Sequence, residues 1–363
     1  MTELPPLTPV QQAIVSTIQV LLIFGANLGL FTAITYVERR LLAFMQFRLG
    51  PNRTGPFGLL QPVADGIKLF FKEELMPESA TRWLFFLAPA LSVASAFLAL
   101  AVVPYGAPVV LPRWGLLPAW LQGRSFPLQI ADLDVGLLYI FAITALGVYG
   151  IVMAGWASNN KYTLLGGLRS SAQMFSYELA LGLSWVGVIM LAGSFRIQDI
   201  VASQQGFSWG LLPNWNVFRQ FPAFVIYLIA ATAECARIPF DLPEGEAELV
   251  AGFHTEYSSM KFAMFQMGEY INLITVSALA SNLFFGGWLS PVAFVPASFF
   301  WFLFKVLAFL FFFIWLRGTL PRFRYDQLMQ FGWKLLVPAA AIWILTTAGF
   351  LAFGPAARVA ALD

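Results

Sequence analysis

Acidic side chains are concentrated in one short and otherwise apolar part of the sequence. The stretch "AECARIPFDLPEGEAELVAGFHTEYSS", residues 233–259, contains six acids, the only cysteine and the only histidine of the chain. The acids are Glu234, Asp241, Glu244, Glu246, Glu248 and Glu256. Buried carboxylic acids suit proton transfer, because desolvation raises their pKa toward neutrality. The first chemistry that these residues suggest is therefore proton relay.

Three glutamates lie inside predicted membrane helices. Glu178, Glu234 and Glu269 each lie a few residues from one end of three consecutive apolar segments. At 1.5 Å per residue, their carboxyl groups are expected on the order of 5–12 Å below the same membrane surface. An ionisable residue in a spanning helix is costly and usually faces protein or water. Three glutamates at a similar depth in the membrane favour a polar path for protons or cations over an isolated helix–helix hydrogen bond.

The spacing of Glu244, Glu246 and Glu248 supports the same interpretation. Three like charges so close together raise one another's pKa, and the first and third share a face if the segment is helical. A solvated acidic loop is the simpler alternative. The flanking "RIPF" and "AELVAGF" are too apolar for a free loop, which favours a structured, half-buried segment.

Other chemically active residues have weaker patterns. Arg237 follows Glu234 by three residues and is expected to pair with it. Lys305, inside a predicted helix, is a candidate for the ion path, but its long stem equally allows it to snorkel outward. His254 and Cys235 are expected to have structural roles, because neither has a set of partners for catalysis or metal binding.

Several kinds of chemistry are excluded or disfavoured by what the sequence lacks. A single cysteine excludes a disulfide framework and an all-cysteine cluster held by this chain alone, and one histidine beside it argues against a metal site. Neither the "GxxxxGK[ST]" nor the "GxGxxG" phosphate-binding pattern occurs. If the protein takes part in redox chemistry, another chain must carry the electrons.

Composition predicts an all-α polytopic membrane protein. Only 11% of the 363 residues are charged and 59% are hydrophobic, whereas a soluble domain carries roughly 25% charged residues. We expect one membrane domain over residues 1–363, with prolines making 105–122 a loop, although a ninth short helix in 104–131 remains open. Eight segments have the length and apolarity of a spanning helix, at 13–37, 83–103, 134–157, 172–193, 221–237, 261–285, 297–317 and 335–354.

Basic residues predict the orientation. Fifteen lie in the loops after the odd-numbered helices and five on the opposite side, which places the N-terminus outside and those loops in the cytoplasm. The first cytoplasmic loop, 38–82, contains "LLQPVADGIKLFFKE", whose spacing predicts an amphipathic helix in the membrane interface. A basic anchor to anionic lipid explains that spacing equally well. The acidic stretch becomes the third cytoplasmic loop, 238–260.

Four long motifs in order resemble one family. They are "ERRLLAFMQFRLGPNRTGPFGLLQPVADGIKLFFKE", "GWASNNKYTLLGGLRSSAQMFSYE", "AECARIPFDLPEGEAELVAGFHTEYSSMKFAMFQMGEY" and "RFRYDQLMQFGWK". They are similar to the H subunit of NADH-quinone oxidoreductase, the membrane subunit at the heel of respiratory complex I. The resemblance covers about residues 20–350 and leaves only the chain ends and loops such as 104–131 unassigned.

The resemblance implies a site and a role. The first and third cytoplasmic loops would form the membrane half of a quinone tunnel, with quinone as substrate. Its expected wall residues are Glu38, Arg39, Arg48, Asp65, Lys68, Arg237, Phe240 and Asp241. The acids expected to relay quinone reduction to proton pumping are Glu178, Glu234, Glu244, Glu246, Glu248 and Glu269. Some bacterial members carry a further Glu where this chain has Ala145, so water or a neighbouring carboxyl would have to replace that link.

The resemblance also implies partners. Iron–sulfur clusters and flavin would be held only by the hydrophilic subunits of the peripheral arm, so we expect no catalysis from the isolated chain. The small A, J and K membrane subunits of the complex and the lipid of a bacterial inner membrane would surround it, with no role for nucleic acid.

Three alternatives remain open. The first is the equivalent subunit of a ferredoxin-dependent quinone reductase or a membrane-bound hydrogenase. The second is a stand-alone cation/proton antiporter, against which the long first loop argues. The third is a scaffold for a peripheral arm, in which the buried glutamates would tolerate substitution.

Overall fold

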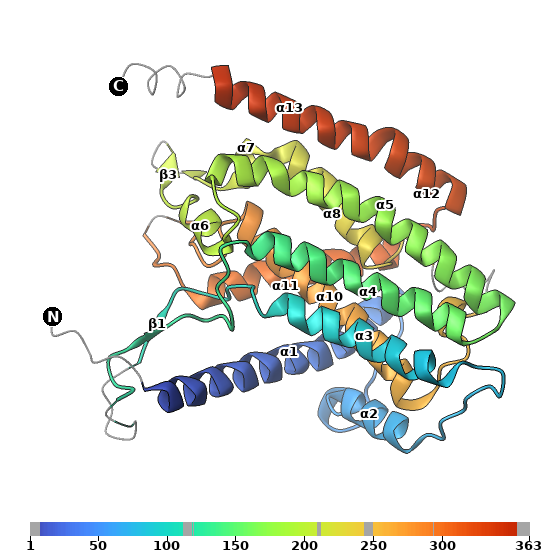
Figure 1. Cartoon of the computed structure of the whole chain (residues 1–363). Helices are drawn as coiled ribbons and strands as arrows, with labels where there is room; N and C mark the ends of the chain where they lie inside the picture. The colour runs from blue at the N-terminus through green and yellow to red at the C-terminus, as the bar shows by residue number, and fades with distance from the viewer. Residues whose placement is uncertain are drawn as a thin grey trace.

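The fold is a bundle of long helices, and the computed structural model describes residues 8–111, 118, 120–208, 212–242, 250–292 and 294–353. The long helices are α1 (Pro9–Met45), α3 (Arg82–Leu100), α4 (Gly136–Ala157), α5 (Lys161–Ala192), α8 (Phe221–Glu234), α10 (Ser259–Phe284), α11 (Phe299–Thr319) and α13 (Val337–Phe353). Figure 1 shows most of them running side by side.

Short elements cover the two ends of the bundle. One end, here called the hairpin end, carries α6 (Ile197–Ala202), α7 (Asn216–Arg219) and two antiparallel hairpins. The strands are β1 (Val109–Val110) with β2 (Ser125–Phe126), and β3 (Phe207–Ser208) with β4 (Leu212–Pro213). The other end, here called the α2 end, carries η1 (Pro56–Gly58), α2 (Gln61–Phe71), η2 (Gly252–His254), α12 (Tyr325–Phe331) and the π-helical turn η3 (Gly332–Leu336).

The prediction of a mostly helical membrane protein is confirmed, although the number of spans is not. Within the described residues, six helices are long and apolar enough to cross a membrane: α1, α3, α4, α5, α11 and the continuous α12–α13. The remaining two predicted spans are also helical. Helix α8 has only 14 residues, and α10 carries buried polar side chains such as Thr275, Ser277 and Asn282. Because α10 is surrounded largely by protein, it does not need the hydropathy of a lipid-facing helix.

Several helices extend beyond the predicted spans. Helix α5 begins at Lys161 and not at 172, with Asn160 as N-cap accepting from the amide of Tyr162 at 3.0 Å. Helix α1 continues to Met45, so Glu38 lies on a helix and not in a loop. Hydropathy falls where polar residues enter a helix, but the backbone hydrogen bonds continue there. In the described part of 104–131 the chain forms the β1–β2 hairpin and no helix.

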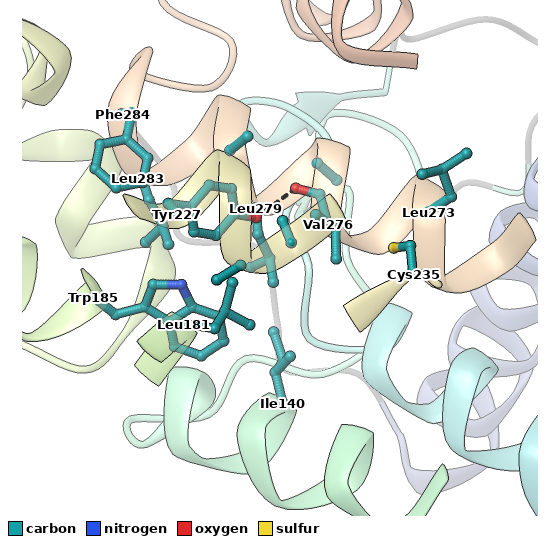
Figure 2. Close-up of a cluster of buried hydrophobic side chains, with 14 of the residues drawn as sticks. Ile140, Leu181, Trp185, Tyr227, Cys235, Leu273, Val276, Leu279, Leu283 and Phe284 are labelled. Carbon is teal, nitrogen blue, oxygen red and sulfur yellow. Dashed lines mark hydrogen bonds between the residues drawn. The ribbon is translucent and has the colours of Figure 1, made fainter. Parts of the chain in front are cut away.

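The core lies where α5, α8 and α10 meet. Figure 2 shows Tyr227 of α8 between Trp185 of α5 and Phe284 of α10, with its hydroxyl donating to the carbonyl of Val276 at 2.7 Å. A buried tyrosine hydroxyl needs such a partner, because an unpaired one costs free energy. A close approach of α4 to α3 depends on Gly150, where a Cβ would lie 2.9 Å from the carbonyl oxygen of Ala88.

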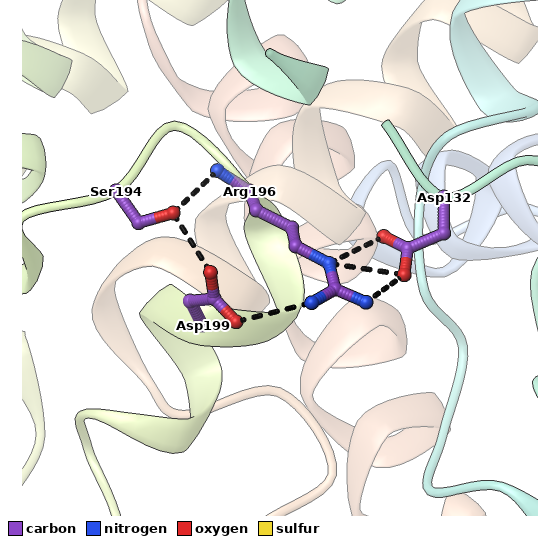
Figure 3. Close-up of polar contacts among 4 residues, drawn as sticks. All are labelled: Asp132, Ser194, Arg196 and Asp199. Carbon is purple, nitrogen blue, oxygen red and sulfur yellow. Dashed lines mark hydrogen bonds and ion pairs between the residues drawn. The ribbon is translucent and has the colours of Figure 1, made fainter. Parts of the chain in front are cut away.

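A cluster of charged side chains at the hairpin end links the segment before α4 to the segment that leads into α6. The Nε of Arg196 donates to both carboxylate oxygens of Asp132 at 3.0 Å, and Asp199 lies 3.6 Å from the same guanidinium. Figure 3 shows Ser194 completing the cluster through a 2.8 Å bond to Asp199. The hydrogen bonds from Arg196 are the main reason that the pKa of Asp132 lies below its usual value.

This cluster predicts a pH-dependent contribution to stability. A lowered folded-state pKa stabilises the protein above the unfolded pKa of about 3.9, and the contribution disappears as pH falls through the folded value. Because both side chains are about one-third exposed, the gain is below about 1 kcal/mol. We expect Asp132→Asn to lower the unfolding temperature at pH 7 by about 1–3 °C, with less difference from the native protein near pH 3.

The measurement is thermal unfolding of the assembled complex at several pH values. Asp134→Asn is the control, because Asp134 has only a longer-range interaction with Arg196. A difference that stays constant down to pH 3 would contradict the assigned role of the Asp132 carboxylate.

Candidate functional site

A partly open cavity of about 90 Å³ lies between α3, α4, α5, α10 and the end of α8. Glu178 of α5, Glu234 of α8 and Glu269 of α10 all line it, together with Cys235 and His254. The three glutamates that the sequence placed at a similar depth therefore line the same cavity. A cavity of this size has room for several water molecules.

Glu178 and Glu234 are incompletely satisfied. Their carboxyl groups lie close enough to repel each other, and Glu234 is hydrogen-bonded by the side chain of Asn272. Among the described residues, Glu178 Oε1 and Glu234 Oε2 are buried without a hydrogen-bond partner. Burying an unpaired carboxylate oxygen is costly, so a proton or water must satisfy it. These two groups have the surroundings of carboxyls that exchange protons.

Helix α4 adds no ionisable side chain to this cavity. It contributes Thr144, Gly147, Val148 and Ile151 to the wall. Ala145, the position at which the family resemblance implies a further Glu in some bacterial members, lies on the same helix.

Arg237 joins a second group of charges at the α2 end. Its Nη1 lies 3.0 Å from Glu38 of α1, and its Nε lies 2.9 Å from Glu269. Its guanidinium stacks over Tyr270 at 4.5 Å from the ring centroid. Arg317 of α11 pairs with the same Glu38 carboxylate. Because Glu269 also lines the cavity, the charge network and the cavity are continuous.

The predicted partner of Arg237 was wrong. The sequence suggested Glu234, three residues away, but the ion pairs of Arg237 are with Glu38 and Glu269. Helix α8 ends at Glu234, and the chain then turns through Ala236 at φ +48°. This turn directs the arginine toward α1 and α10. Sequence reasoning also missed Arg317, because a basic residue in the last turn of an apolar helix was counted only as an orientation signal.

The other predicted tunnel residues on α1, in the turn after it and on α2 lie near the protein surface. Arg39 pairs with Asp65, which also accepts from Gln61 at 2.9 Å, so this pair joins α1 to α2. Arg48 donates to Gln46 at 2.7 Å, and Lys68 is exposed on α2.

Phe240 lies apart from that surface. Its ring stacks on Phe323 at 5.7 Å and contacts Tyr177 at 5.6 Å, while its carbonyl accepts from Gln173 at 2.7 Å. Asp241 follows it and is partly buried. Glu244, Glu246 and Glu248 lie outside the described residues.

Lys305 is buried at the opposite end of α10 from Glu269. Its Nζ donates to the carbonyl oxygens of Phe285, Gly287 and Leu289 at 2.7, 2.8 and 2.7 Å. It also lies 4.4 Å from the ring centroid of Trp215. The snorkelling alternative was therefore wrong, because the ammonium points into the protein. Lys305 is not among the residues that line the cavity.

The fold and the site together define a helical integral membrane protein with an acid-lined cavity joined to an arginine–glutamate network. The family model described as NADH dehydrogenase matches residues 18–348, close to the extent that the motifs predicted. The chain belongs to the family of H subunits of NADH-quinone oxidoreductase, which is complex I.

Three relatives show how extensive the similarity is. The NADH-quinone oxidoreductase H subunit 2 of Geobacter sulfurreducens is 54% identical, over 92% of this chain and 96% of the relative. Subunit 8 of the Thermus thermophilus enzyme is 50% identical, over 94% and 88% respectively. The H subunit of the Rhodospirillum rubrum enzyme is 48% identical, over 93% and 94%.

Proposed function

We propose that this chain forms the membrane part of a quinone-binding tunnel in a proton-pumping NADH:quinone oxidoreductase and relays quinone reduction to proton movement. The observation that carries the proposal is the shared cavity of Glu178, Glu234 and Glu269. Carboxyl groups from three helices that enclose space for water form a route along which protons can move. A role limited to anchoring other subunits would not require this arrangement.

The charge network supplies the connection to the quinone. Glu38 and Arg237 lie at the α2 end, next to the α1–α2 region that the Arg39–Asp65 pair holds together. Quinone reduction takes up protons, so it changes the local charge. Weakening the Glu38–Arg237 pair would alter the hold of Arg237 on Glu269. Glu269 would then pass the change to Glu234 and Glu178 across the cavity.

The proposal extends to surroundings and partners. The protein would lie in a bacterial inner membrane with the α2 end toward the cytoplasm, where Glu244, Glu246 and Glu248 would join the relay. Hydrophilic subunits would bring iron–sulfur clusters and flavin to the quinone, and the A, J and K subunits would flank the chain. The names of the relatives favour NADH over ferredoxin or hydrogen as the electron source.

The test is Glu234→Gln in the assembled complex. Glutamine keeps the size and the bond with Asn272 but cannot carry a proton, so we expect inhibitor-sensitive NADH:quinone reductase activity to fall on the order of tenfold or more. Assembly should be retained, because a neutral amide is no harder to bury than the acid. The measurements are complex yield on native gels, reductase rate and proton pumping in vesicles.

Glu78→Gln is the matched control, since Glu78 is an exposed acid that does not line the cavity. Unchanged activity in Glu234→Gln would remove the relay and favour a scaffold. Cation–proton exchange by the purified single chain would support an antiporter instead.

A further inference from the structure

His254 occupies a position that its sequence context did not reveal. It is the only histidine of the chain and lies in η2, where it is 9% exposed and lines the cavity that holds Glu178, Glu234 and Glu269. Histidine is the side chain whose ordinary pKa, about 6.5, allows it to exchange protons near neutral pH.

The fold holds the ring in place through close packing of η2. A Cβ at Gly166 of α5 would lie 2.7 Å from the amide nitrogen of Phe253, so only glycine permits this approach. The His254 ring makes edge contacts with Phe253 at 5.0 Å and with Phe262 at 5.4 Å. These two aromatic contacts fix the orientation of the imidazole ring.

The groups around the cavity are suited to receive a proton from His254. Its other titratable members are Glu178 from α5, Glu234 and Cys235 from the end of α8, and Glu269 from α10. Helices α3 and α4 contribute small, hydroxyl and aliphatic side chains. Of these acids, Glu269 is held by Arg237, whereas Glu178 and Glu234 each have a buried oxygen without a hydrogen-bond partner among the described residues.

Residues near His254 in the sequence reach the protein surface. Thr255 and Glu256, the next two residues, are partly exposed, and Val250 is 61% exposed. His254 therefore belongs both to a partly exposed segment and to the wall of the cavity.

We propose that His254 transfers protons between the surface near η2 and the glutamates of the cavity. The neutral imidazole accepts a proton at one ring nitrogen and becomes imidazolium. The other nitrogen then releases its proton to a carboxylate, which becomes a carboxylic acid, and the ring returns to its neutral form. This proposal rests on the relay proposed above and adds a residue that the relay did not include.

The test uses His254→Ala and His254→Gln in the assembled complex. We expect both to lower the coupled reductase rate about fivefold or more, because neither side chain carries a proton at neutral pH. Added imidazole should restore about half of the lost rate in His254→Ala, with a pH dependence that follows imidazole. Phe262→Leu, which removes a ring contact and keeps the histidine, should stay within about twofold of the native rate.

The outcomes separate this inference from the proposed function. A normal rate in both His254 variants with a slow Glu234→Gln would overturn the role of His254 and leave the relay intact. Normal rates in all three variants would overturn the relay itself. A slow His254→Ala that imidazole does not relieve would show that the ring only fills space.

Discussion

Replacing Arg237 with methionine is expected to prevent stable assembly of the complex. Arg237 is 4% exposed and lies between the carboxylates of Glu38 and Glu269. Methionine is close to its size but leaves two acids near each other without the cation between them. Removing one partner of a buried ion pair costs about 3–5 kcal/mol, which is a large part of the stability of most domains.

Two further variants separate charge from geometry at this position. Arg237→Lys keeps the charge but cannot hold two carboxylates with a planar fork, so we expect assembly with a several-fold lower reductase rate. Adding Glu269→Gln to Arg237→Met removes the acid that loses its ion pair with Arg237, while Glu38 keeps its ion pair with Arg317. Assembly should then recover while activity stays low. The measurements are the yield of complex on native gels and the reductase rate per assembled complex. Normal assembly and activity of Arg237→Met alone would show that the network contributes little.

Lys305→Met is expected to destabilise the hairpin end of the bundle without changing proton relay. An ammonium has three N–H donors, and Lys305 has three carbonyl acceptors just beyond the C-terminus of α10. The last carbonyls of a helix have no partner within it, and the positive charge also matches the negative end of the helix dipole. Methionine would leave these buried carbonyls unpaired, at about 1–3 kcal/mol for each one that water cannot reach.

The measurement is the thermal unfolding temperature of the complex, which we expect to fall by about 3–6 °C or more. The reductase rate per assembled complex and its pH profile should match the native protein, because Lys305 does not line the cavity. Lys305→Arg is the control, since it keeps a buried cation with several donors. A Lys305→Met variant that remains stable but no longer pumps protons would contradict this structural role and show that Lys305 belongs to the ion path.

The partners of the charged residues explain why sequence reasoning succeeded only in part. Arg237 was paired with its neighbour Glu234, whereas its partner Glu38 lies 199 positions away in the sequence. The sequence left Lys305 between the ion path and outward snorkelling, because backbone carbonyl acceptors cannot be recognised from residue types. Arg317 was counted for its charge alone, although it shares Glu38 with Arg237. Each of these contacts depends on how helices pack, which local spacing does not contain.

Composition and motifs were enough to assign the class of the protein, its family and the residue types of the site. Composition is sufficient for the class, because a lipid-solvated chain must be apolar over most of its length. The sequence also predicts that Glu178, Glu234 and Glu269 lie at a similar depth, because the depth of a residue follows from its position along its own helix.

Packing between the helices determines which of these groups share a cavity and which are neutralised by a partner. It joined Glu269 to both Arg237 and the cavity, placed His254 on the cavity wall, and separated Lys305 from it. The physical reason is that charge pairing and burial depend on side-chain directions across different helices. Those directions follow from close packing at positions such as Gly150 and Gly166, where the presence of a Cβ would separate the backbones.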